Sequence, residues 1–598
     1  MAYLRDIIYY FSVFRKHLGY RLYIVFFLTG LATATEAFGI TLLLPLIELM
    51  ESSDPDTEVS GITGVLQSFL ETIGIADSVI GILLFIAGVF MIKGAIKFST
   101  GFYHAVLLSQ LLREIKGNLF QKYRNMDYRY YTNQNTGHFV NIISQQVNRL
   151  LHGFIAFKKF LSEIIITLMY MIFAFLVSWE FALMAAFAGV IILILFQKLN
   201  YYVKQLSVKS SEEYSSLHAF LVQTLQSFPY LAATAQFDHL ASKVTGSVHK
   251  LANYMRRQQI ASAFTGAVRE PVSVLILLTI IILQITVFDA RIASIVVSLL
   301  LIYRSIGHFM AIQSSWQQTM NMAGGIDMVE KEFEQLSNYQ ESSGGINPGE
   351  LTGQIRYENV VFSYDNQYDP TLRDISFIIN PRETVAFFGP SGAGKSTLID
   401  TLTLLLQPQE GTIAINDIPH PQIDRHAWRK QIGYVSQDMV MFDDTIANNI
   451  AMWSGDYNAD SRIKNKIKYA AKQADAIRFI EDLPDGFNTK IGDRGVRLSG
   501  GQKQRLFIAR ELFKSPTLLI LDEATNSLDS ETELTIRNSI VELKGTLTVV
   551  IITHHMASIR KADRIYTMND GQIINHGKFD ELIENDSSFR NTAESQQI

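Results

Sequence analysis

The sequence predicts a membrane all-α domain of six transmembrane helices fused to a cytoplasmic α/β domain with a phosphate-binding loop. Three observations predict this fold class. Of the 598 residues, 48% are hydrophobic and only 18% are charged, against about 25% charged residues in soluble domains. Six apolar stretches long enough to cross a bilayer precede residue 340. Beyond it, short apolar strands alternate with helical segments around a G-x-x-x-x-G-K-[ST] pattern.

Composition excludes several classes of protein. The mean hydropathy of +0.15 argues against a wholly soluble or a disordered chain. The formal net charge of −5 argues against a general nucleic-acid binder, so no nucleic-acid partner is expected. Because the sequence contains no Cys, disulfides, zinc–thiolate sites, iron–sulfur clusters and cysteine nucleophiles are all excluded.

Residues 1–337 are predicted to form the transmembrane domain. The six spans cover roughly residues 24–48, 78–100, 158–178, 181–199, 271–290 and 292–312. The first is too long for a signal peptide and lacks a cleavage-like ending. The intervening segments 101–157 and 200–262 contain few Gly or Pro, so the helices are expected to extend far into the cytoplasm.

The distribution of charge predicts the orientation. Basic residues precede the first span and follow the second and fourth spans, at Arg5, Arg15, Lys16, Arg21, Arg113, Lys116, Lys122, Lys198, Lys204 and Lys209. The first outer loop carries acidic residues instead, at Glu51, Asp54, Asp56 and Glu58. By the positive-inside rule, the N-terminus and the nucleotide domain are cytoplasmic and the chain is a multi-pass protein of the cell (inner) membrane.

The first outer loop also contains an amphipathic segment. Residues 64–73 place apolar side chains at helical spacing. Two interpretations stay open: a short helix lying on the outer membrane surface, or a helix packed on its own protein.

A polar, Gly-containing linker is predicted at residues 338–350, followed by the nucleotide domain at residues 351–598. Its clearest motif is the phosphate loop, between an apolar strand and a helix, formed by Gly389, Pro390, Ser391, Gly392, Ala393, Gly394, Lys395, Ser396 and Thr397. The glycines let backbone N–H groups surround the phosphates. Lys395 is expected to reach the β- and γ-phosphates and Ser396 to bind Mg²⁺.

A second apolar strand, residues 518–521, ends in two carboxylates, Asp522 and Glu523. Ligands of parallel sheets bind at the carboxyl ends of the strands. Adjacent strand residues point opposite ways, so the two carboxylates are expected to differ in role. Asp522 suits Mg²⁺ coordination through water and Glu523 suits polarising the attacking water.

A third motif is an anion site at the start of a helix. It consists of Ser499, Gly500, Gly501 and Gln502, ahead of the helical run 503–513. A hydroxyl and unobstructed glycine amides at a helix N-terminus favour binding of a phosphate.

With these motifs in this order, the chain from about residue 351 resembles the nucleotide-binding domain of an ABC transporter. The resemblance implies roles for four further residues. Tyr364 resembles the aromatic residue that stacks on adenine, and Gln437 the glutamine that contacts Mg²⁺ and faces the membrane domain. Asp529 resembles the residue linking the two nucleotide sites, and His554 the histidine that touches the γ-phosphate.

The six spans ahead of one nucleotide domain resemble the exporter type of this family. The resemblance implies a homodimer with ATP and Mg²⁺ as cofactors, in which each ATP lies between the phosphate loop of one subunit and Ser499–Gly501 of the other. Asn526, Ser527, His555 and Asp493 depart from the commonest family pattern, but none removes a catalytic group. Cytoplasmic turns near 130–137 and 226–230 are expected to press on the nucleotide domains.

Charged residues inside spans are costly and usually functional. The basic candidates for a cargo cavity are Lys93, Arg269 and Arg304, although Glu270 could pair with Arg269. Glu163 lies near a predicted cytoplasmic end and is expected to snorkel or to pair structurally. Basic residues on spans two, five and six, with the outer-loop segment, resemble the bacterial lipid and lipid-linked oligosaccharide flippases, which implies an anionic lipid or lipid-linked glycan as substrate and partner.

Two rival functions stay open at this level. A peptide or multidrug exporter is the alternative within transport, although a multidrug pump would favour an aromatic, less basic cavity. A membrane-tethered regulatory ATPase that does not pump is the rival from another class, and an intact Glu523 argues against it. Transport in vesicles would discriminate between them.

Overall fold

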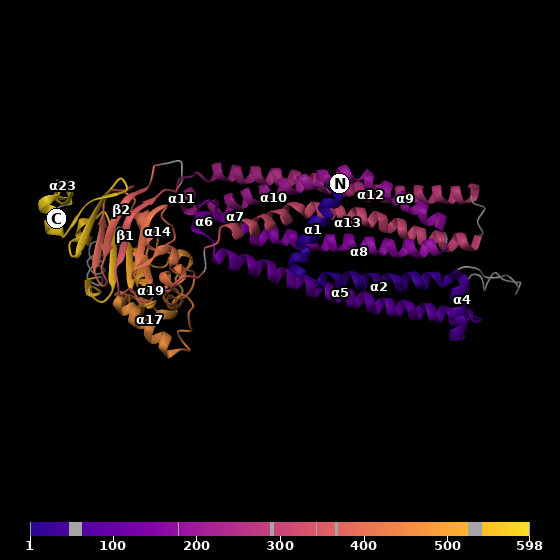
Figure 1. Cartoon of the computed structure of the whole chain (residues 1–598), viewed down its shortest axis with the longest axis horizontal. Helices are drawn as coiled ribbons and strands as arrows, with labels where there is room; N and C mark the ends of the chain where they lie inside the picture. The colour runs from indigo at the N-terminus through magenta and orange to yellow at the C-terminus, as the bar shows by residue number, and fades with distance from the viewer. Residues whose placement is uncertain are drawn as a thin grey trace. The chain divides into compact units, whose positions relative to one another are not determined.

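The computed structural model describes residues 2–46, 62–177, 179–287, 292–341, 344–364, 369–523 and 541–596. The chain divides into two compact units, residues 1–340 and residues 341–598. Unit 1 is helical and unit 2 is built on two β-sheets (Figure 1). Asp529, Asn526, Ser527 and the acidic residues 51–58 lie outside the described residues, as does the side chain of Arg304.

The helices of unit 1 include several that are far longer than a bilayer requires. α5 runs for 46 residues, which corresponds to about 69 Å at about 1.5 Å per residue. The main elements are α1 (Ala2–Leu18), α2 (Arg21–Thr41), α4 (Ile62–Ile73), α5 (Val79–Arg124), α6 (Tyr128–Thr132), α7 (Thr136–Asn141), a π-helical turn (Ile142–Gln146), α8 (Val147–Val177), α9 (Trp179–Leu195), α10 (Gln197–Gln226), α11 (Phe228–Ala233), α12 (Phe237–Val287) and α13 (Ile292–Asn338).

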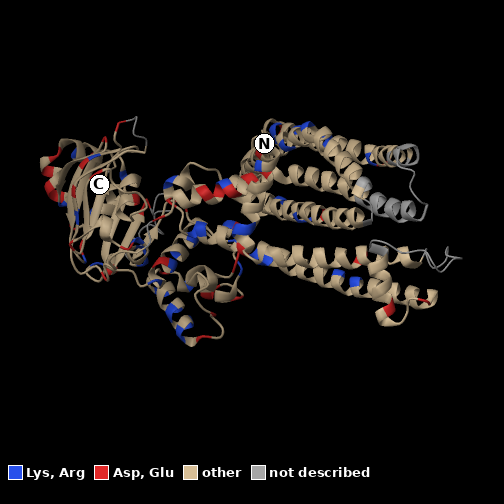
Figure 2. Cartoon of the chain, turned by 45° about the vertical axis from the view of Figure 1, so that its right-hand side comes forward, with Lys and Arg blue, Asp and Glu red and all other residues tan. Residues whose placement is uncertain are grey.

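Five helical segments among the described residues are long and apolar enough to cross a membrane. They are Arg21–Leu46, Val79–Arg124, Thr136–Leu176, Ala182–Gln226 and Phe237–Thr279, and they contain the first five predicted spans in part or whole. The sixth predicted span, 292–312, lies at the start of α13, where the side chains of 292–305 are not described. Charged residues gather along the part of unit 1 near α6 and α11, whereas long stretches of the same helices carry few (Figure 2).

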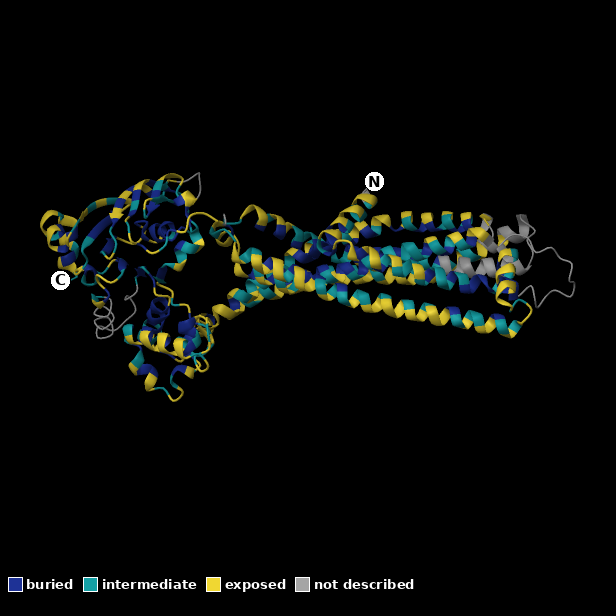
Figure 3. Ribbon diagram, turned by 60° about the horizontal axis from the view of Figure 1, so that its bottom comes forward, coloured by how far each residue is buried: buried dark blue, intermediate teal, exposed yellow. Residues whose placement is uncertain are grey.

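The core of unit 1 lies where α1 packs against α5, α8 and α13. Its largest fully buried side chains include Tyr10 and Phe14 from α1, Phe154 and Phe157 from α8, and Trp316 from α13. The spans themselves are much less covered within the chain: only 11% of the most apolar window of Val79–Arg124 is buried (Figure 3). Apolar surface of this kind requires lipid or a second subunit to cover it.

A buried polar cluster joins three helices of unit 1. Arg149 of α8 donates hydrogen bonds to Ser210 and Ser207 of α10, at 3.1 Å and 2.8 Å, and to the carbonyl of Asn321 in α13. Gly324 of α13 approaches so closely that an added Cβ would lie 2.3 Å from the carbonyl oxygen of Ser207. Burial lowers the pKa of the Arg149 guanidinium to about 10. We call these five residues the Arg149 cluster.

Unit 2 contains a four-stranded antiparallel sheet, in the order β2-β1-β4-β5, and a six-stranded sheet, in the order β10-β9-β3-β8-β7-β6. The strands are β1 (Ile355–Phe362), β2 (Leu372–Ile379), β3 (Thr384–Phe388), β4 (Glu410–Ile415), β5 (Ile418–Pro419), β6 (Ile432–Val435), β7 (Leu518–Asp522), β8 (Thr548–Thr553), β9 (Arg564–Asn569) and β10 (Gln572–Gly577). Strands β6, β7, β8, β3 and β9 run parallel. β3 and β7 are buried along their whole length, which explains why they consist almost entirely of apolar residues.

Helices cover the sheets and extend to one side of them (Figure 1). They are α14 (Lys395–Leu402), α15 (Arg425–Lys430), α16 (Ile446–Ala451), α17 (Ser461–Gln473), α18 (Ile477–Glu481), α19 (Gly500–Phe513), α21 (Met556–Ile559), α22 (Phe579–Asn585) and α23 (Ser587–Ser595). α16 to α19 share a buried core with β6 and β7, which fixes α19 relative to the six-stranded sheet.

Candidate active site

Four neighbouring parallel strands deliver the predicted catalytic residues to one edge of the six-stranded sheet. The phosphate loop follows β3, His554 follows β8, Asp522 ends β7, and Gln437 lies two residues beyond β6. Because the carboxyl ends of parallel strands meet at the same edge, residues separated by more than 160 positions in the sequence come together.

The phosphate loop connects β3 to α14 through glycines that no other residue could replace without strain. An added Cβ at Gly389 would lie 2.2 Å from the carbonyl oxygen of Met568, and Gly394 has a φ of +91°. Lys395 begins α14, and its Nζ donates to the carbonyls of Gly389 and Pro390, both at 2.7 Å. The loop therefore folds around the Lys395 side chain. Its backbone amides surround the position that phosphates occupy in phosphate-binding loops.

The two carboxylates at the end of β7 lie in different environments. Asp522 is buried, and burial raises the pKa of its carboxyl to about 6. The Tyr434 hydroxyl of β6 donates to Asp522 Oδ2 at 3.3 Å. Glu523 has a φ of +48°, a left-handed conformation that costs energy for a residue with a Cβ. Backbone strain of this kind occurs often at active sites.

His554 and Glu523 are in contact. His554 Nδ1 lies 3.0 Å from Glu523 Oε1, and the Glu523 amide donates to the carbonyl of Ile552 in β8 at 2.8 Å. Asp522 and Glu523 also act electrostatically on the buried Lys395, opposing the lowering of its pKa by burial. Lys395, Asp522, Glu523 and His554, four residues from three strand ends, thus form one charged cluster.

Tyr364 and Gln437 flank this cluster. Tyr364, in the segment after β1, is 60% exposed, and its hydroxyl lies 3.2 Å from Thr397 Oγ1 in α14. An exposed aromatic ring tied to the phosphate-loop helix is available for stacking on a base. Gln437 is exposed, two residues after β6.

The Ser499–Gln502 motif forms a capping box at the start of α19. Ser499 Oγ accepts from the Gln502 amide at 3.3 Å, and the Ser499 amide donates to Gln502 Oε1 at 2.9 Å. At the other end of α19, the buried Arg510 donates to the carbonyl of Asn449 in α16 at 2.7 Å, which fixes the helix. The motif is therefore presented at a rigid helix N-terminus.

The side chains fit a magnesium ion that is bound mainly by nucleotide. Ser396, Gln437 and Asp522 offer hydroxyl, amide and carboxylate oxygens, the donor types that Mg²⁺ prefers. Among the described residues, no group of three or more His, Asp or Glu side chains could hold a metal without a nucleotide. Mg²⁺ commonly takes one or two carboxylates together with substrate phosphates.

Tyr434 is a site residue that the sequence analysis did not identify. It lies in a strand otherwise composed of Ile432, Gly433 and Val435, paired in register with Ile520 of β7. A hydroxyl in a buried strand needs a hydrogen-bond partner. The Tyr434 hydroxyl was thus visible in the sequence, but its partner, Asp522, depends on β7 lying beside β6.

The proposed cargo residues are distributed differently from the catalytic ones. Lys93 of α5 lies 2.8 Å from Glu36 of α2, and both side chains are largely buried. The sequence predicts Lys93 as a residue of the cargo cavity, and the α2–α5 packing places the acidic Glu36 beside it. Arg269 and Glu270 are exposed on α12 and form no ion pair with each other among the described side chains. Adjacent positions on a helix point in different directions.

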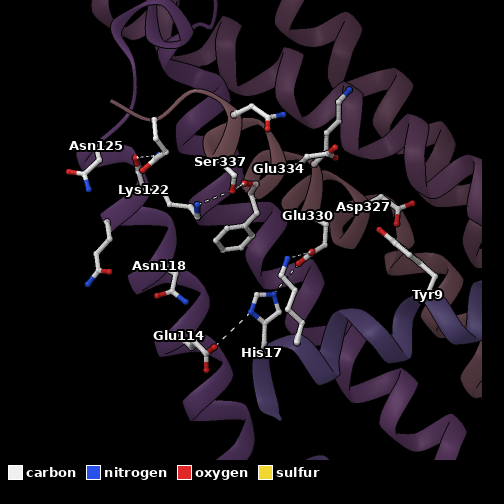
Figure 4. Close-up of a pocket in the computed structure, with 16 residues that line it drawn as sticks. Tyr9, His17, Glu114, Asn118, Lys122, Asn125, Asp327, Glu330, Glu334 and Ser337 are labelled. Carbon is white, nitrogen blue, oxygen red and sulfur yellow. Dashed lines mark hydrogen bonds and ion pairs between the residues drawn. The ribbon is translucent and has the colours of Figure 1, made fainter. Parts of the chain in front are cut away.

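Two further polar features of unit 1 are structural. Glu163 of α8 lies 2.6 Å from His308 of α13, in agreement with the expected structural pairing. A polar cavity of about 840 Å³ lies between α1, α5 and α13 (Figure 4). His17 enters it from α1, 3.0 Å from Glu330. Neither Lys93 nor Arg269 lines it.

Comparisons with known proteins agree with this geometry. Residues 372–526 match the family described as ABC transporter, and residues 22–314 match the ABC transporter transmembrane region. The chain is 27% identical over 561 residues to the heterocyst differentiation ATP-binding protein HepA of Nostoc sp., covering 93% of this chain and 90% of that protein. It is 28% identical over 506 residues to an ATP-dependent lipid A-core flippase of Burkholderia orbicola, covering 83% of each.

A solved structure shares the fold. The structure of a bacterial Atm1-family ABC exporter with ATP bound superposes with a TM-score of 0.78 at 21% identity, covering 96% of this chain and 97% of that one. At this identity the likeness establishes the architecture, a helical transmembrane domain joined to an α/β nucleotide-binding domain.

Proposed function

This chain belongs to the ABC transporter family, and from that premise we propose that it is a homodimeric flippase that carries an amphipathic lipid with an anionic head group across the cell membrane. Membership of this family implies ATP binding and the architecture of an ATPase-coupled exporter. The lipid cargo, the homodimer, and an inner-membrane location with a cytoplasmic N-terminus and nucleotide domain belong to the proposal.

The Glu523–His554 contact beside Lys395 is the observation that supports ATP hydrolysis by this chain. In the proposed mechanism, Lys395 and the loop amides hold the β- and γ-phosphates. Glu523 orients and polarises the attacking water, and His554 donates to the γ-phosphate. Ser396, Gln437 and Asp522 would hold Mg²⁺, which would supply positive charge beside the phosphates. Tyr364 stacks on the adenine ring.

The placement of the two phosphate-binding motifs on different elements supports the proposed dimer. Ser499–Gly501 lies at the start of α19, whereas the phosphate loop lies between β3 and α14. We propose that Ser499–Gly501 of one subunit closes the site of its partner, with Asp529 near the junction. Binding of ATP would then favour the closed pair by its differential affinity for that state.

The cargo assignment rests on the basic residues that the sequence places in or beside the spans. A basic residue in a low-dielectric region attracts a phosphate strongly when no acidic partner already neutralises it. The Lys93–Glu36 pair removes Lys93 from the first choices, so Arg269 and Arg304 are the residues proposed to meet the head group. The similarity to lipid A-core flippases, at 27–28% identity, supports a lipid cargo.

Reconstitution tests this function. In proteoliposomes, the wild type is expected to flip a polyprenyl-phosphate or acidic glycolipid probe only with ATP. A variant carrying Arg269→Gln and Arg304→Gln should lose flipping and keep its basal ATPase. Arg113→Gln, which removes an exposed basic residue from the cytoplasmic part of α5, is the matched control and should flip normally. Equal or better transport of a neutral drug or peptide by the double variant would contradict the lipid cargo and support the rival exporters. Mass spectrometry of co-purified lipid would identify the class directly.

A further inference from the structure

The last helix of the described chain packs beneath the catalytic edge of the sheet. Phe589 and Ala593 of α23 are buried in one cluster with Phe388, the final residue of β3, and with Met556 of α21. The Phe589 and Phe388 rings lie 5.4 Å apart in an edge-to-face arrangement. The helix is therefore fixed relative to the strand that leads into the phosphate loop.

The residue that follows this helix, Gln596, makes two hydrogen bonds to backbone on either side of the catalytic histidine. Its Oε1 accepts from the Met556 amide at 2.8 Å, and its Nε2 donates to the His554 carbonyl at 2.9 Å. One backbone partner is a donor and the other an acceptor, and the amide side chain satisfies both at once because it carries a separate acceptor oxygen and donor nitrogen.

The segment from His554 to Met556 is also held by the His555 amide, which donates to Thr553 Oγ1 at 2.9 Å, and by the buried Met556 side chain. Met556 begins the short helix α21, and its predecessor His555 provides no side-chain cap. The first amides of a helix have no partner within the helix, so an external acceptor is needed to hold them. Gln596 supplies that acceptor. On the preceding side, β8 pairs with β3 and β7 up to Ile552 and Thr553. His554 therefore lies between a paired strand and the two hydrogen bonds of Gln596.

We propose that Gln596 is a positioning residue for ATP hydrolysis, which holds the backbone of His554 so that its imidazole faces Glu523 and the γ-phosphate. The inference deepens the proposed function and depends on the role given there to His554. It assigns a part in turnover to a C-terminal residue that lies outside every recognised motif and more than 40 positions beyond the histidine.

The first experiment separates turnover from nucleotide binding in the full-length protein. Gln596→Ala removes both contacts and should lower kcat about tenfold, in line with the loss of two hydrogen bonds. The Kd for ATP and the Tm should stay unchanged. Gln596→Glu keeps an acceptor for Met556 but opposes the His554 carbonyl, and should give an intermediate kcat. Glu594→Gln alters an exposed neighbour on α23 and should leave kcat unchanged.

A double-mutant cycle tests whether the effect passes through the histidine. In a His554→Ala background, Gln596→Ala should produce no further fall in the residual ATPase. The proposal is overturned if Gln596→Ala retains the wild-type kcat, or if it lowers the rate equally with and without His554.

Amide hydrogen exchange provides a readout that does not depend on catalysis. Gln596→Ala should accelerate exchange of the Met556 amide, while Glu594→Gln should not. An unchanged exchange rate of the Met556 amide would contradict the proposal that Gln596 holds this backbone. A wild type without ATPase activity would contradict the proposed function instead, and the exchange result would still decide whether Gln596 holds this backbone.

Discussion

The strand end that carries Glu523 allows ATP binding to be separated from ATP hydrolysis by a single substitution. Glu523→Gln keeps the size and hydrogen-bonding capacity of the side chain and removes its charge. Turnover should fall by about 10²-fold or more, because the attacking water loses its polarising carboxylate. ATP binding should persist, and the protein should accumulate as a closed dimer. ATPase assays with nucleotide-trapping measurements check this, and wild-type turnover would remove Glu523 from the role.

Asp327 offers a second test, which concerns stability. Its carboxyl lies beside Tyr9 in the polar cavity (Figure 4), and burial raises its pKa to about 6. Its Oδ1 has no hydrogen-bond partner in the described part of the chain. The folded state therefore binds a proton more tightly than the unfolded state does. The resulting stabilisation is present at low pH and is lost as the pH rises through about 6.

Asp327→Asn should consequently raise the Tm at pH 7.5 by about 2 °C or more, because it removes the buried negative charge. The gain should shrink as the pH falls from 6 toward 4, where the native aspartate becomes neutral. Thermal unfolding of both proteins across this range measures the difference. A lower Tm for the variant at pH 7.5 would mean that Lys204 and Tyr9 stabilise the charge more than burial opposes it.

Residues of the nucleotide site could be predicted from sequence where the motif is continuous. The phosphate loop and the Asp522–Glu523 pair each occupy one strand–loop segment, so local spacing specifies them. Tyr434 and Gln596 could not be predicted, because their partners depend on strand order and on the docking of the last helix. For Lys93, the sequence shows the charge but not the helix pairing that brings Glu36 beside it.

At the level of elements, the Arg149 cluster determines how closely α8, α10 and α13 approach. Gly324→Ala would place a methyl group against the Ser207 carbonyl and force α10 and α13 apart, so we expect destabilisation of about 1–3 kcal/mol. Gly117→Ala in α5 is the control, because an added Cβ there meets nothing within 4 Å. It should stabilise by up to about 1 kcal/mol through helix propensity. Thermal unfolding should therefore shift in opposite directions, and equal shifts would contradict the close-packing account.

The Lys93–Glu36 pair joins α2 to α5 within the spans, and a charge cycle distinguishes its structural role from contact with cargo. Lys93→Gln alone leaves Glu36 charged and partly buried, and should lower stability. Combining it with Glu36→Gln removes both charges and should restore both stability and flipping. Flipping assays on the single and double variants decide between the roles. A double variant that is stable but does not flip lipid would support a contact between Lys93 and the cargo.

Helix type and length were accessible from sequence because apolar runs and scarce Gly and Pro mark them directly. The amphipathic segment 64–73 illustrates the limit. α4 buries Leu66 and Leu70 against its own protein and exposes Val65, Phe69 and Ile73. Its sequence supported two interpretations, and the helix combines features of both: one face packs on unit 1 and the other is apolar and uncovered within the chain.

For the whole molecule, the order of a span-rich half and a nucleotide half follows from composition alone, whereas the proposed closure of the nucleotide site involves a second chain. The spacing of motifs in one sequence does not give the distance between Ser499 of one subunit and the phosphate loop of the other. The orientation in the membrane is likewise inferred only from the Lys and Arg count, and the natural absence of Cys makes it directly testable.

Single cysteines at two exposed positions test this topology. Thr72 is exposed on α4, in the segment predicted to lie outside, and Ser216 is exposed on α10, in the long basic segment predicted to lie inside. In intact cells, Thr72→Cys should react with an impermeant thiol reagent and Ser216→Cys should not, because basic loops remain cytoplasmic. Permeabilised cells are the control: Ser216→Cys should then react, which shows that the membrane and not burial protected it. Ser210, in the same helix, would be a misleading choice because it is buried against Arg149. Labelling of Ser216→Cys but not Thr72→Cys in intact cells would invert the orientation and place the nucleotide site on the side of the membrane that lacks ATP, a result incompatible with ATP-driven transport.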